Sequence, residues 1–333
     1  MAILPESPLA HHRPGGGFRN PWPGIEPHGL GDLLRWQMDR IHGTPQDPPR
    51  SSFERATPDF PVPRAAEMEL LATWVGHSTV LLQLGTTNVL TDPIWSARAS
   101  PLSFIGPKRW VDPGVELGRL PPLDLVLLSH NHYDHLDERT VRRLASLHPA
   151  AAWVVPLGLA LRLRSWGVRK VSELDWWESL RVSEATITCT PAQHFSARGF
   201  GDRNRTLWCG YAVHTRSHRV FFAGDTGYHP DFGRIGARLG PFDLALIPIG
   251  AYAPRWFMRS VHMDADEALS AYNDVRAAHP VSRPAMLPIH WGTFKLTDEP
   301  MDEPPRRLRD AWQRAALDTG RLWLLKHGET RRR

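Results

Sequence analysis

The sequence contains only two cysteines, Cys189 and Cys209, among its 333 residues. Two cysteines are too few for a disulfide framework, and their spacing does not form a CxxC metal motif. We therefore interpret both as buried thiols. The chain also lacks an uninterrupted run of roughly 18 apolar residues, which a membrane-spanning helix requires. An integral membrane protein is therefore not expected.

The N-terminus lacks the basic segment followed by an apolar segment that is typical of a secretory signal peptide. A cytoplasmic location is the resulting expectation. The formal net charge is +5, and the sequence closes on the basic stretch TRRR at Arg333, which favours anionic partners in general. Other basic residues are scattered without regularly interleaved aromatic residues, so a specific nucleic-acid partner is not expected.

Composition divides the chain into two parts. Residues 1–65 are rich in proline, glycine, histidine and arginine around one helical stretch at 30–41, and we predict an arm packed on the core. Residues 66–333 alternate strand and helix patterns, which predicts one α/β domain of two packed sheets with helices outside. The predicted elements are a hairpin over 69–95 with its turn at 85–87, strands at 123–128, 152–156, 170–174, 185–191, 208–215, 219–224, 244–249, 285–289 and 322–326, and helices at 137–147, 157–167, 264–278 and 305–320.

The strand predicted at 123–128 is followed by an H-x-H-x-D-H motif made of His130, His132, Asp134 and His135. Alternation along the strand directs His130 and His132 to one side, and the turn that follows then presents Asp134 and His135. Zinc binds imidazole and carboxylate groups, and four of them on one turn favour two adjacent ions. A histidine-rich surface loop is the alternative, but this spacing directly after a buried strand favours a metal site.

Three further ligand-type residues each follow an apolar run: His194, Asp225 and His290. Taken singly, each could be structural, since an aspartate in the sequence AGDTG is an ordinary turn residue. Strand ends are nevertheless where a rigid scaffold presents functional side chains. Together the three residues would complete the ligand set of two ions.

Several sequence blocks between about residues 71 and 329 resemble one family. They include TWVGHSTVLLQL, LTDPIWSARASP, LPPLDLVLLSHNHYDHLD, FFAGDTGYHPDF and IHWGTF, and they are similar to the N-acyl-phosphatidylethanolamine-hydrolysing phospholipase D family of the metallo-β-lactamase superfamily. The resemblance implies an αββα sandwich and two zinc ions. It assigns His130, His132 and His194 to one ion, Asp134, His135 and His290 to the other, and Asp225 to a bridging position.

The same resemblance implies a phospholipase D type phosphodiesterase. Such an enzyme hydrolyses N-acyl-phosphatidylethanolamine-like lipids to N-acylethanolamine and phosphatidic acid by attack of a metal-bridging hydroxide on phosphorus. Asp134, Asp225 and His262 would be catalytic, with His262 near the phosphate, although a surface histidine before a helix is the alternative. His77 and Asp92 end strands of the early hairpin and could hold the ligands by hydrogen bonds. The family typically forms homodimers.

The segment from Arg255 through Trp256, Phe257 and Met258 to Arg259 is the predicted substrate-binding region. Apolar bulk beside positive charge suits a phospholipid, although aromatic loops also serve plain packing. The 14 tryptophans and the basic surface would favour peripheral contact with an anionic membrane, at its inner face for a cytoplasmic protein. Two positions depart from the family pattern: Phe195 stands where tryptophan is expected, and Cys209 where glycine is usual.

Other functions share part of this pattern. A metal-dependent lactonase or nucleotide phosphodiesterase of the same superfamily would use the same ligands, because the surrounding loops choose the substrate. A nucleic-acid-binding protein with a structural metal is a third alternative. Structural zinc sites are usually rich in cysteine and closed by four protein ligands, and the predicted site contains no cysteine, so catalysis is favoured.

Overall fold

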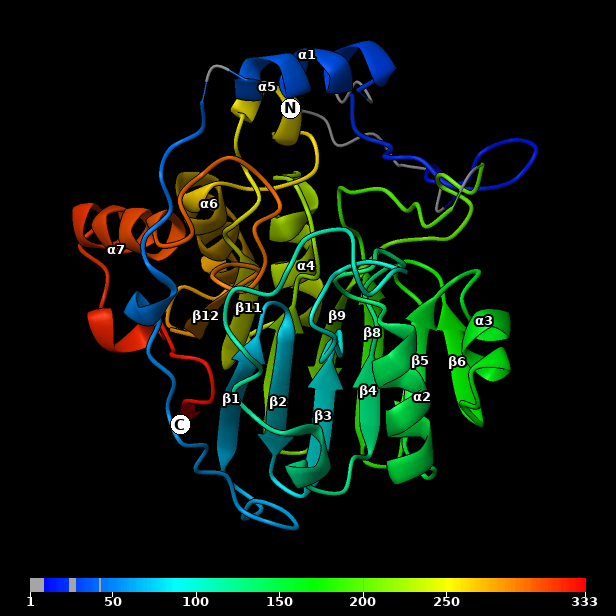
Figure 1. The fold of residues 1–333 in the computed structure, drawn as a ribbon. Coiled ribbons are helices and arrows are strands. Elements are labelled where there is room, and N and C mark those ends of the chain that lie inside the picture. Colours follow the sequence, from blue (N-terminus) through cyan, green and yellow to red (C-terminus); the bar gives the residue numbers. More distant parts are fainter. Residues whose placement is uncertain (1–8, 24–27, 42, 200) are drawn as a thin grey trace.

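The computed structural model describes residues 9–23, 28–41, 43–199 and 201–333. Two mixed β-sheets pack face to face, and helices cover both outer faces (Figure 1). The predicted αββα sandwich is therefore confirmed. The first eight residues of the predicted arm lie outside the described residues, and the division at residue 65 stays a prediction.

The first sheet has seven strands in the order β13-β1-β2-β3-β4-β5-β6. Strands β1 to β3 form the antiparallel part, which confirms the predicted hairpin turn between Leu84 and Thr87, whereas β3 to β6 run parallel. Its strands are β1 (Leu70–Gly76), β2 (Thr79–Leu84), β3 (Thr87–Thr91), β4 (Leu125–Leu127), β5 (Ala152–Pro156), β6 (Lys170–Leu174) and β13 (Thr330–Arg332).

The second sheet has six strands in the order β12-β11-β10-β9-β8-β7. Here β10, β11 and β12 are parallel, and the remaining pairs are antiparallel. Its strands are β7 (Ser179–Val182), β8 (Ala185–Thr190), β9 (Gly210–His214), β10 (Arg219–Phe222), β11 (Leu244–Pro248) and β12 (Ala285–Ile289).

Three apolar layers hold the sandwich together. The central layer lies between the sheets and includes Trp74, Trp208 and Tyr211, all buried. The two outer layers lie between each sheet and its helices, α2 (Glu138–Leu147) and α3 (Ala160–Ser165) on the first sheet, and α4 (Asp231–Leu239), α6 (Ala265–Ala277) and α7 (Glu303–Arg314) on the second. No helix among the described residues has both the length and the apolar character needed to cross a membrane.

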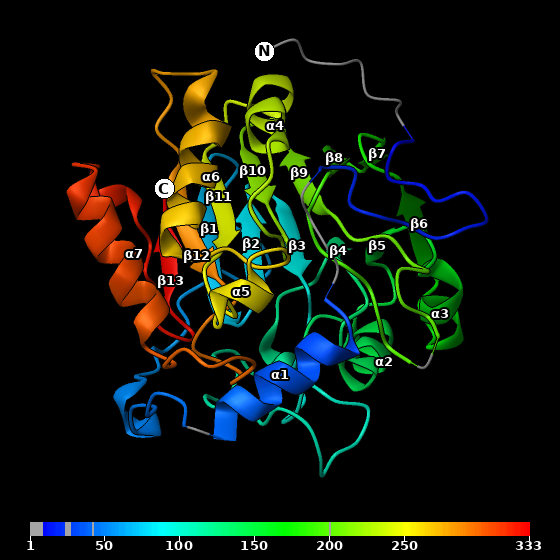
Figure 2. The same cartoon turned by 90° about the horizontal axis from the view of Figure 1, so that it is seen from above.

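The N-terminal arm runs across the edge of the sandwich at which the metal-binding motif lies. Its helix α1 (Leu30–Ile41) lies against the short helix α5 (Arg255–Met258) in both views (Figures 1 and 2). The rings of Trp36 and Phe257 are 5.0 Å apart, and the Trp36 indole donates a hydrogen bond of 2.5 Å to Asp298. The arm therefore packs directly on loops of the core.

Two predicted elements near the C-terminus are wrong. Residues 322–326 do not form a strand, because Leu322 makes only an isolated bridge with Met286, and the C-terminal strand is β13. The last helix ends at Arg314 rather than near Gly320, which instead belongs to a 3₁₀ turn. Four helices and strands were not predicted: β7, β13, α4 and α5. The helix predicted at 264–278 is present as α6, and Asp264 caps it by accepting from the backbone N–H groups of Asp266 and Glu267.

Candidate metal centre

All seven predicted metal ligands lie at one edge of the sandwich, beyond the carboxyl ends of neighbouring strands. The H-x-H-x-D-H motif follows β4 in the first sheet. His194, Asp225 and His290 follow β8, β10 and β12 in the second sheet. Because the two sheets face each other, their loops meet at this edge (Figure 1). The structure therefore brings the two halves of the predicted set together.

The backbone around this edge is strained. His77, Asp92 and His290 adopt positive φ angles of 55°, 31° and 61°. Non-glycine residues rarely occupy this region, and each such residue costs about 1–3 kcal/mol. Gly224, which precedes Asp225, has φ of 63°, and an added Cβ would lie 2.6 Å from the carbonyl oxygen of Cys209. The fold tolerates this strain where it positions the polar side chains.

His130, His132 and His194 form the first group of ligand atoms. The Nδ1 atom of His132 lies 2.8 Å from His130 Nε2 and 3.2 Å from His194 Nε2. The other ring nitrogens are occupied, because His194 Nδ1 donates to the carbonyl of Val261 at 3.0 Å and His130 Nδ1 lies 2.8 Å from Ser129 Oγ. The two Nε2 atoms thus direct lone pairs at a common point. Tetrahedral zinc ligands are separated by about 3.3 Å, so the group fits one ion.

Burial governs the charge of this group. It lowers the pKa of His132 to about 3 and that of His194 to about 4, and the pKa of His130 lies well below its usual value for the same reason. These histidines are therefore neutral at physiological pH. The neutral imidazole is the form that binds a metal ion.

Asp134, His135, Asp225 and His290 form the second group. The Asp225 Oδ2 atom lies 3.0 Å from His135 Nε2 and 2.9 Å from His290 Nε2, and 4.0 Å from His194 Nε2 of the first group. The Asp134 Oδ2 atom lies 3.4 Å and 3.5 Å from the same two nitrogens. Asp225 is therefore the carboxylate that reaches both groups.

Several atoms of the second group have no hydrogen-bond partner. His135 Nε2, His290 Nε2 and Asp225 Oδ1 are all buried without one in the described part of the chain. Such orphaned polar atoms are costly unless another charge occupies the space between them. Although burial would lower the pKa of His290, the nearby carboxylates of Asp225 and Asp134 raise it to about 9. A divalent cation among these carboxylates would replace that proton, so the donor set fits a metal ion.

Asp92 and His77 form hydrogen bonds with residues of the second group. Asp92 Oδ2 accepts from His135 Nδ1 and from Ser129 Oγ, both at 2.6 Å, and Asp92 Oδ1 accepts from the Ser129 backbone at 2.7 Å. His77 Nε2 lies 2.9 Å from Asp134 Oδ2. The structure thus places both residues where hydrogen bonds orient ligand-type side chains.

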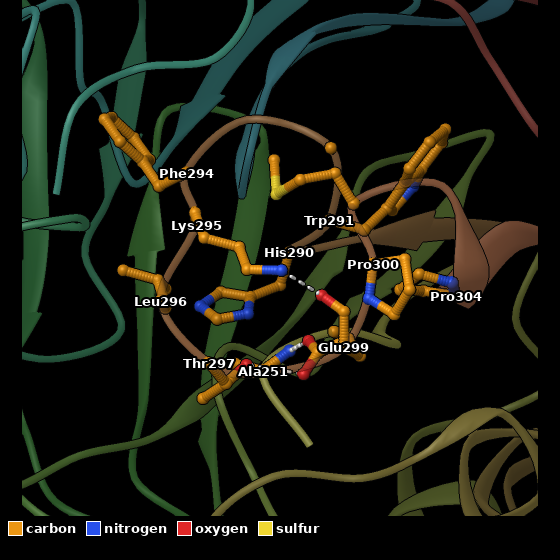
Figure 3. A pocket seen from close by; sticks show the side chains of 13 residues that line it. Ala251, His290, Trp291, Phe294, Lys295, Leu296, Thr297, Glu299, Pro300 and Pro304 are labelled. Atoms are coloured by element: carbon orange, nitrogen blue, oxygen red, sulfur yellow. Dashed lines mark hydrogen bonds between the residues drawn. The ribbon is translucent and has the colours of Figure 1, made fainter. Parts of the chain in front are cut away.

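The loop after β12 begins at His290 and is held by its own hydrogen bonds. Figure 3 shows Lys295 and Glu299 of this loop beside His290. Lys295 Nζ donates to the Glu299 carbonyl at 2.6 Å, and the Glu299 carboxylate accepts from the backbone N–H of Ala251 at 2.7 Å and from Thr297 Oγ1 at 2.6 Å. The loop is therefore cross-linked to the segment after β11.

His262 lies at the rim of the two groups. Its ring centre is 5.1 Å from those of both His194 and His290, its side chain is buried, and its Nδ1 atom lacks a hydrogen-bond partner among the described residues. Burial lowers its pKa well below the usual value. A surface histidine, the alternative considered from the sequence, does not match this position.

The predicted substrate-binding segment is divided by the structure. Arg255 pairs with Glu267 at 2.6 Å, Arg259 pairs with the same carboxylate at 3.2 Å, and Met258 is buried. Trp256 is partly exposed, and only Phe257 lines the pocket that contains His194. Both arginines therefore pair with Glu267 of α6.

The sequence patterns did not point to two residues of the centre. Ser129, directly before the first motif histidine, connects Asp92 to His130. Asn20 of the arm brackets the backbone of His194, donating to its carbonyl at 2.9 Å and accepting from its N–H at 3.2 Å. The position of Ser129 beside the motif could have indicated it, whereas nothing in the sequence connects Asn20 with a residue 174 positions away.

The fold and the donor set define a metal-dependent hydrolase of αββα architecture. Comparison with protein families gives the same class, because the beta-lactamase superfamily domain matches residues 87–291. The chain belongs to the metallo-β-lactamase superfamily.

Several relatives have substantial identity. N-acyl-phosphatidylethanolamine-hydrolyzing phospholipase D 1 of Caenorhabditis elegans is 43% identical over 278 residues, covering 78% of this chain and 76% of that protein. The mitochondrial N-acyl-phosphatidylethanolamine-hydrolyzing phospholipase D of Saccharomyces cerevisiae is 36% identical and matches 71% of this chain and 50% of its own length. An uncharacterized protein of Mycobacterium tuberculosis is 44% identical over 83% of this chain and 72% of its own length.

Solved structures share the fold at lower identity. The metallo hydrolase Igni18 of Ignicoccus hospitalis superposes with a TM-score of 0.60 at 21% identity, over 80% of this chain and 98% of that one. An isothiocyanate hydrolase from Delia radicum gut bacteria gives a TM-score of 0.61 at 19% identity, over 78% of this chain and 98% of that one. These likenesses show the architecture alone.

Proposed function

We propose that the protein is a dinuclear zinc phosphodiesterase of phospholipase D type. Its substrates are N-acyl-phosphatidylethanolamine-like phospholipids, and its products are N-acylethanolamine and phosphatidic acid. The convergence of seven ligand-type side chains from both sheets carries the proposal, because Asp225 lies within 4.0 Å of donor nitrogens in both groups. The 43% and 36% identical relatives with this printed activity support the choice of substrate.

The roles of the residues follow from their positions. We assign His130, His132 and His194 to one ion, Asp134, His135 and His290 to the second, and the bridging position to Asp225. Two bound zinc ions supply a nucleophilic water at neutral pH and neutralise charge on the phosphoryl group.

Side chains around the ligand groups orient the ligands and the substrate. Asp92 and Ser129 fix the orientation of ligand rings, and His77 holds the Asp134 carboxylate. His262, buried and neutral beside both groups, orients the phosphate by hydrogen bonding. Peripheral contact with an anionic membrane and a homodimer belong to the same proposal.

Elemental analysis combined with a product assay tests this function. Purified protein is expected to contain two zinc equivalents per chain and to release N-acylethanolamine from N-acyl-phosphatidylethanolamine. A lactone and a cyclic nucleotide should be turned over far more slowly. Faster hydrolysis of either compound would reassign the enzyme within its superfamily, and a metal-free protein that is fully active would remove the metal from the proposal.

A further inference from the structure

A pocket of about 190 Å³ opens beside His194, and the N-terminal arm forms one of its walls. Arg13 and Arg19 of the arm line it together with Arg203, which lies in the loop after His194. The lining includes no aspartate or glutamate. Three arginines and a candidate metal ligand therefore line the same pocket.

Among the described residues, the three guanidinium groups have no carboxylate partner. No described carboxylate lies within salt-bridge distance of Arg13, Arg19 or Arg203, in contrast to Arg255 and its partner Glu267. Arg19 Nε donates to the carbonyl of Ala10 at 2.9 Å, which turns the side chain without neutralising it. Burial lowers the pKa of Arg203, and the charge of Arg13 lowers it further. Grouped like charges of this kind are repulsive until an anion enters.

Aromatic side chains also contribute to the wall. The Arg203 guanidinium lies 4.5 Å from the centre of the Phe195 ring, and this ring lies 4.5 Å from that of His132. Phe257 lines the pocket from α5. A ligand here meets both guanidinium donors and ring faces, which suits an organic phosphate better than a bare ion.

The arm is held in place at this wall. Asn20 is bonded twice to the His194 backbone, and His11 and His12 donate to the two oxygens of Asp175 at 2.6 and 2.7 Å. In the sequence, Arg13 directly follows His11 and His12, and Arg19 directly precedes Asn20. The arm thus presents its arginines from a fixed position.

We propose that this pocket is a phosphate subsite, in which Arg13, Arg19 and Arg203 hold the phosphate ester of a ligand with an apolar substituent beside the metal centre. The arm is then part of the binding site and not an appendage. The inference deepens the proposed function by naming what selects an anionic lipid, and it rests on that function for its biological meaning.

Direct binding to the full-length, metal-containing protein tests the subsite independently of turnover. The probes are dihexanoyl phosphatidic acid, dihexanoyl phosphatidylcholine and inorganic phosphate, each followed by titration calorimetry. Arg13→Gln and Arg203→Gln should each weaken binding of the phosphatidic acid about five- to tenfold, because a charge-assisted hydrogen bond is lost. Arg203→Lys should recover part of this loss, and binding should weaken with added salt.

The control is Arg169→Gln, which removes an exposed arginine outside the pocket and should leave all affinities unchanged. Binding of dihexanoyl phosphatidylcholine, whose phosphate carries one negative charge beside a cationic choline, should respond less to the pocket variants than binding of phosphatidic acid. Unchanged affinity for phosphatidic acid in both variants would overturn the subsite, and equal affinity for inorganic phosphate would overturn its assignment to an organic phosphate. A protein that prefers lactones yet shows these arginine effects would refute the proposed function and leave the subsite standing.

Discussion

Asp92 connects the two groups of the candidate centre. One of its carboxylate oxygens accepts from His135 Nδ1 and Ser129 Oγ, and Ser129 Oγ also contacts His130. His135 of the second group contacts this buried carboxylate directly, and His130 of the first group is connected to it through Ser129. Loss of its charge should disturb both groups at once.

Asp92→Asn is expected to lower zinc affinity about 10–100-fold, because an amide can no longer accept all of these hydrogen bonds. Competition with a zinc-binding dye measures this change. Asp124→Asn is the control, since Asp124 is bonded to Arg64 and the Asn88 backbone rather than to the centre. Equal zinc affinity in Asp92→Asn and the wild-type protein would contradict the assigned role.

A second residue-level prediction concerns His229, which is buried between the rings of Trp22 and Phe232. Burial lowers its pKa to about 3, and neither ring nitrogen has a hydrogen-bond partner among the described residues. In the unfolded chain the group titrates near 6.5. The unfolded state therefore binds more protons between pH 6.5 and 3, so stability falls as the pH falls through this range.

His229→Leu removes this dependence. The unfolding free energy of the variant, relative to wild type, should rise by up to about 1.4 kcal/mol for each pH unit below 6.5. Urea denaturation at pH 7.5, 5.5 and 4.5 measures the difference. Parallel pH profiles of the two proteins would show that His229 is not the group responsible.

The candidate donors could be predicted from the sequence because each one lies in the loop that follows an apolar strand. The chain direction and the alternation of side chains then place His130 or Asp225 at a strand end without knowledge of the rest. Asn20 and the carbonyl of Val261 could not be predicted in this way. Both act on His194 through contacts between distant segments, and no local pattern records such a contact.

At the level of elements, one carboxylate is among the anchors of the arm. Asp175, which follows β6, accepts from His11 and His12. Asp175→Asn leaves an acceptor for only one of the two imidazoles. We expect the arm to open more readily by about 2 kcal/mol, as for a hydrogen bond to a charged group.

Hydrogen exchange of peptides covering residues 9–23 measures this opening and should become about 30-fold faster. Peptides of β4 and β10 should not change. Glu173→Gln is a control from the same strand, because Glu173 accepts from the Ala160 backbone and does not contact the arm. Equal protection of the arm in Asp175→Asn and wild type would show that other contacts hold it.

The wrong elements near the C-terminus have a physical explanation. Residues 322–326 are apolar, and Leu322, Trp323 and Leu325 are indeed buried, but burial does not require a strand partner. The strand forms instead at Thr330–Arg332, where three residues pair with β1 and show no hydrophobic alternation. The basic C-terminus was expected to attract anionic partners. Part of it instead makes contacts within the protein, because Arg332 pairs with Asp59 at 3.0 Å.

At the scale of the whole molecule, the candidate centre joins the two sheets. Its ligand-type residues come from the loop after β4 in one sheet and from the ends of β8, β10 and β12 in the other. Elsewhere the sheets meet mainly through apolar side chains of the central layer. Ions at this edge would therefore cross-link the sandwich at one end.

Removal of metal should consequently destabilise the entire fold. A ligand present at 100 times its dissociation constant stabilises the folded state by about 2.7 kcal/mol. Treatment with a chelator is therefore expected to lower the melting temperature of the wild-type protein, and added zinc should restore it. In Asp225→Asn the residue that reaches both groups has lost its charge, so the chelator should cause a smaller shift. If wild type melts at the same temperature with and without chelator, the residues at this edge do not bind an ion that links the sheets, and the apolar layer alone holds them together.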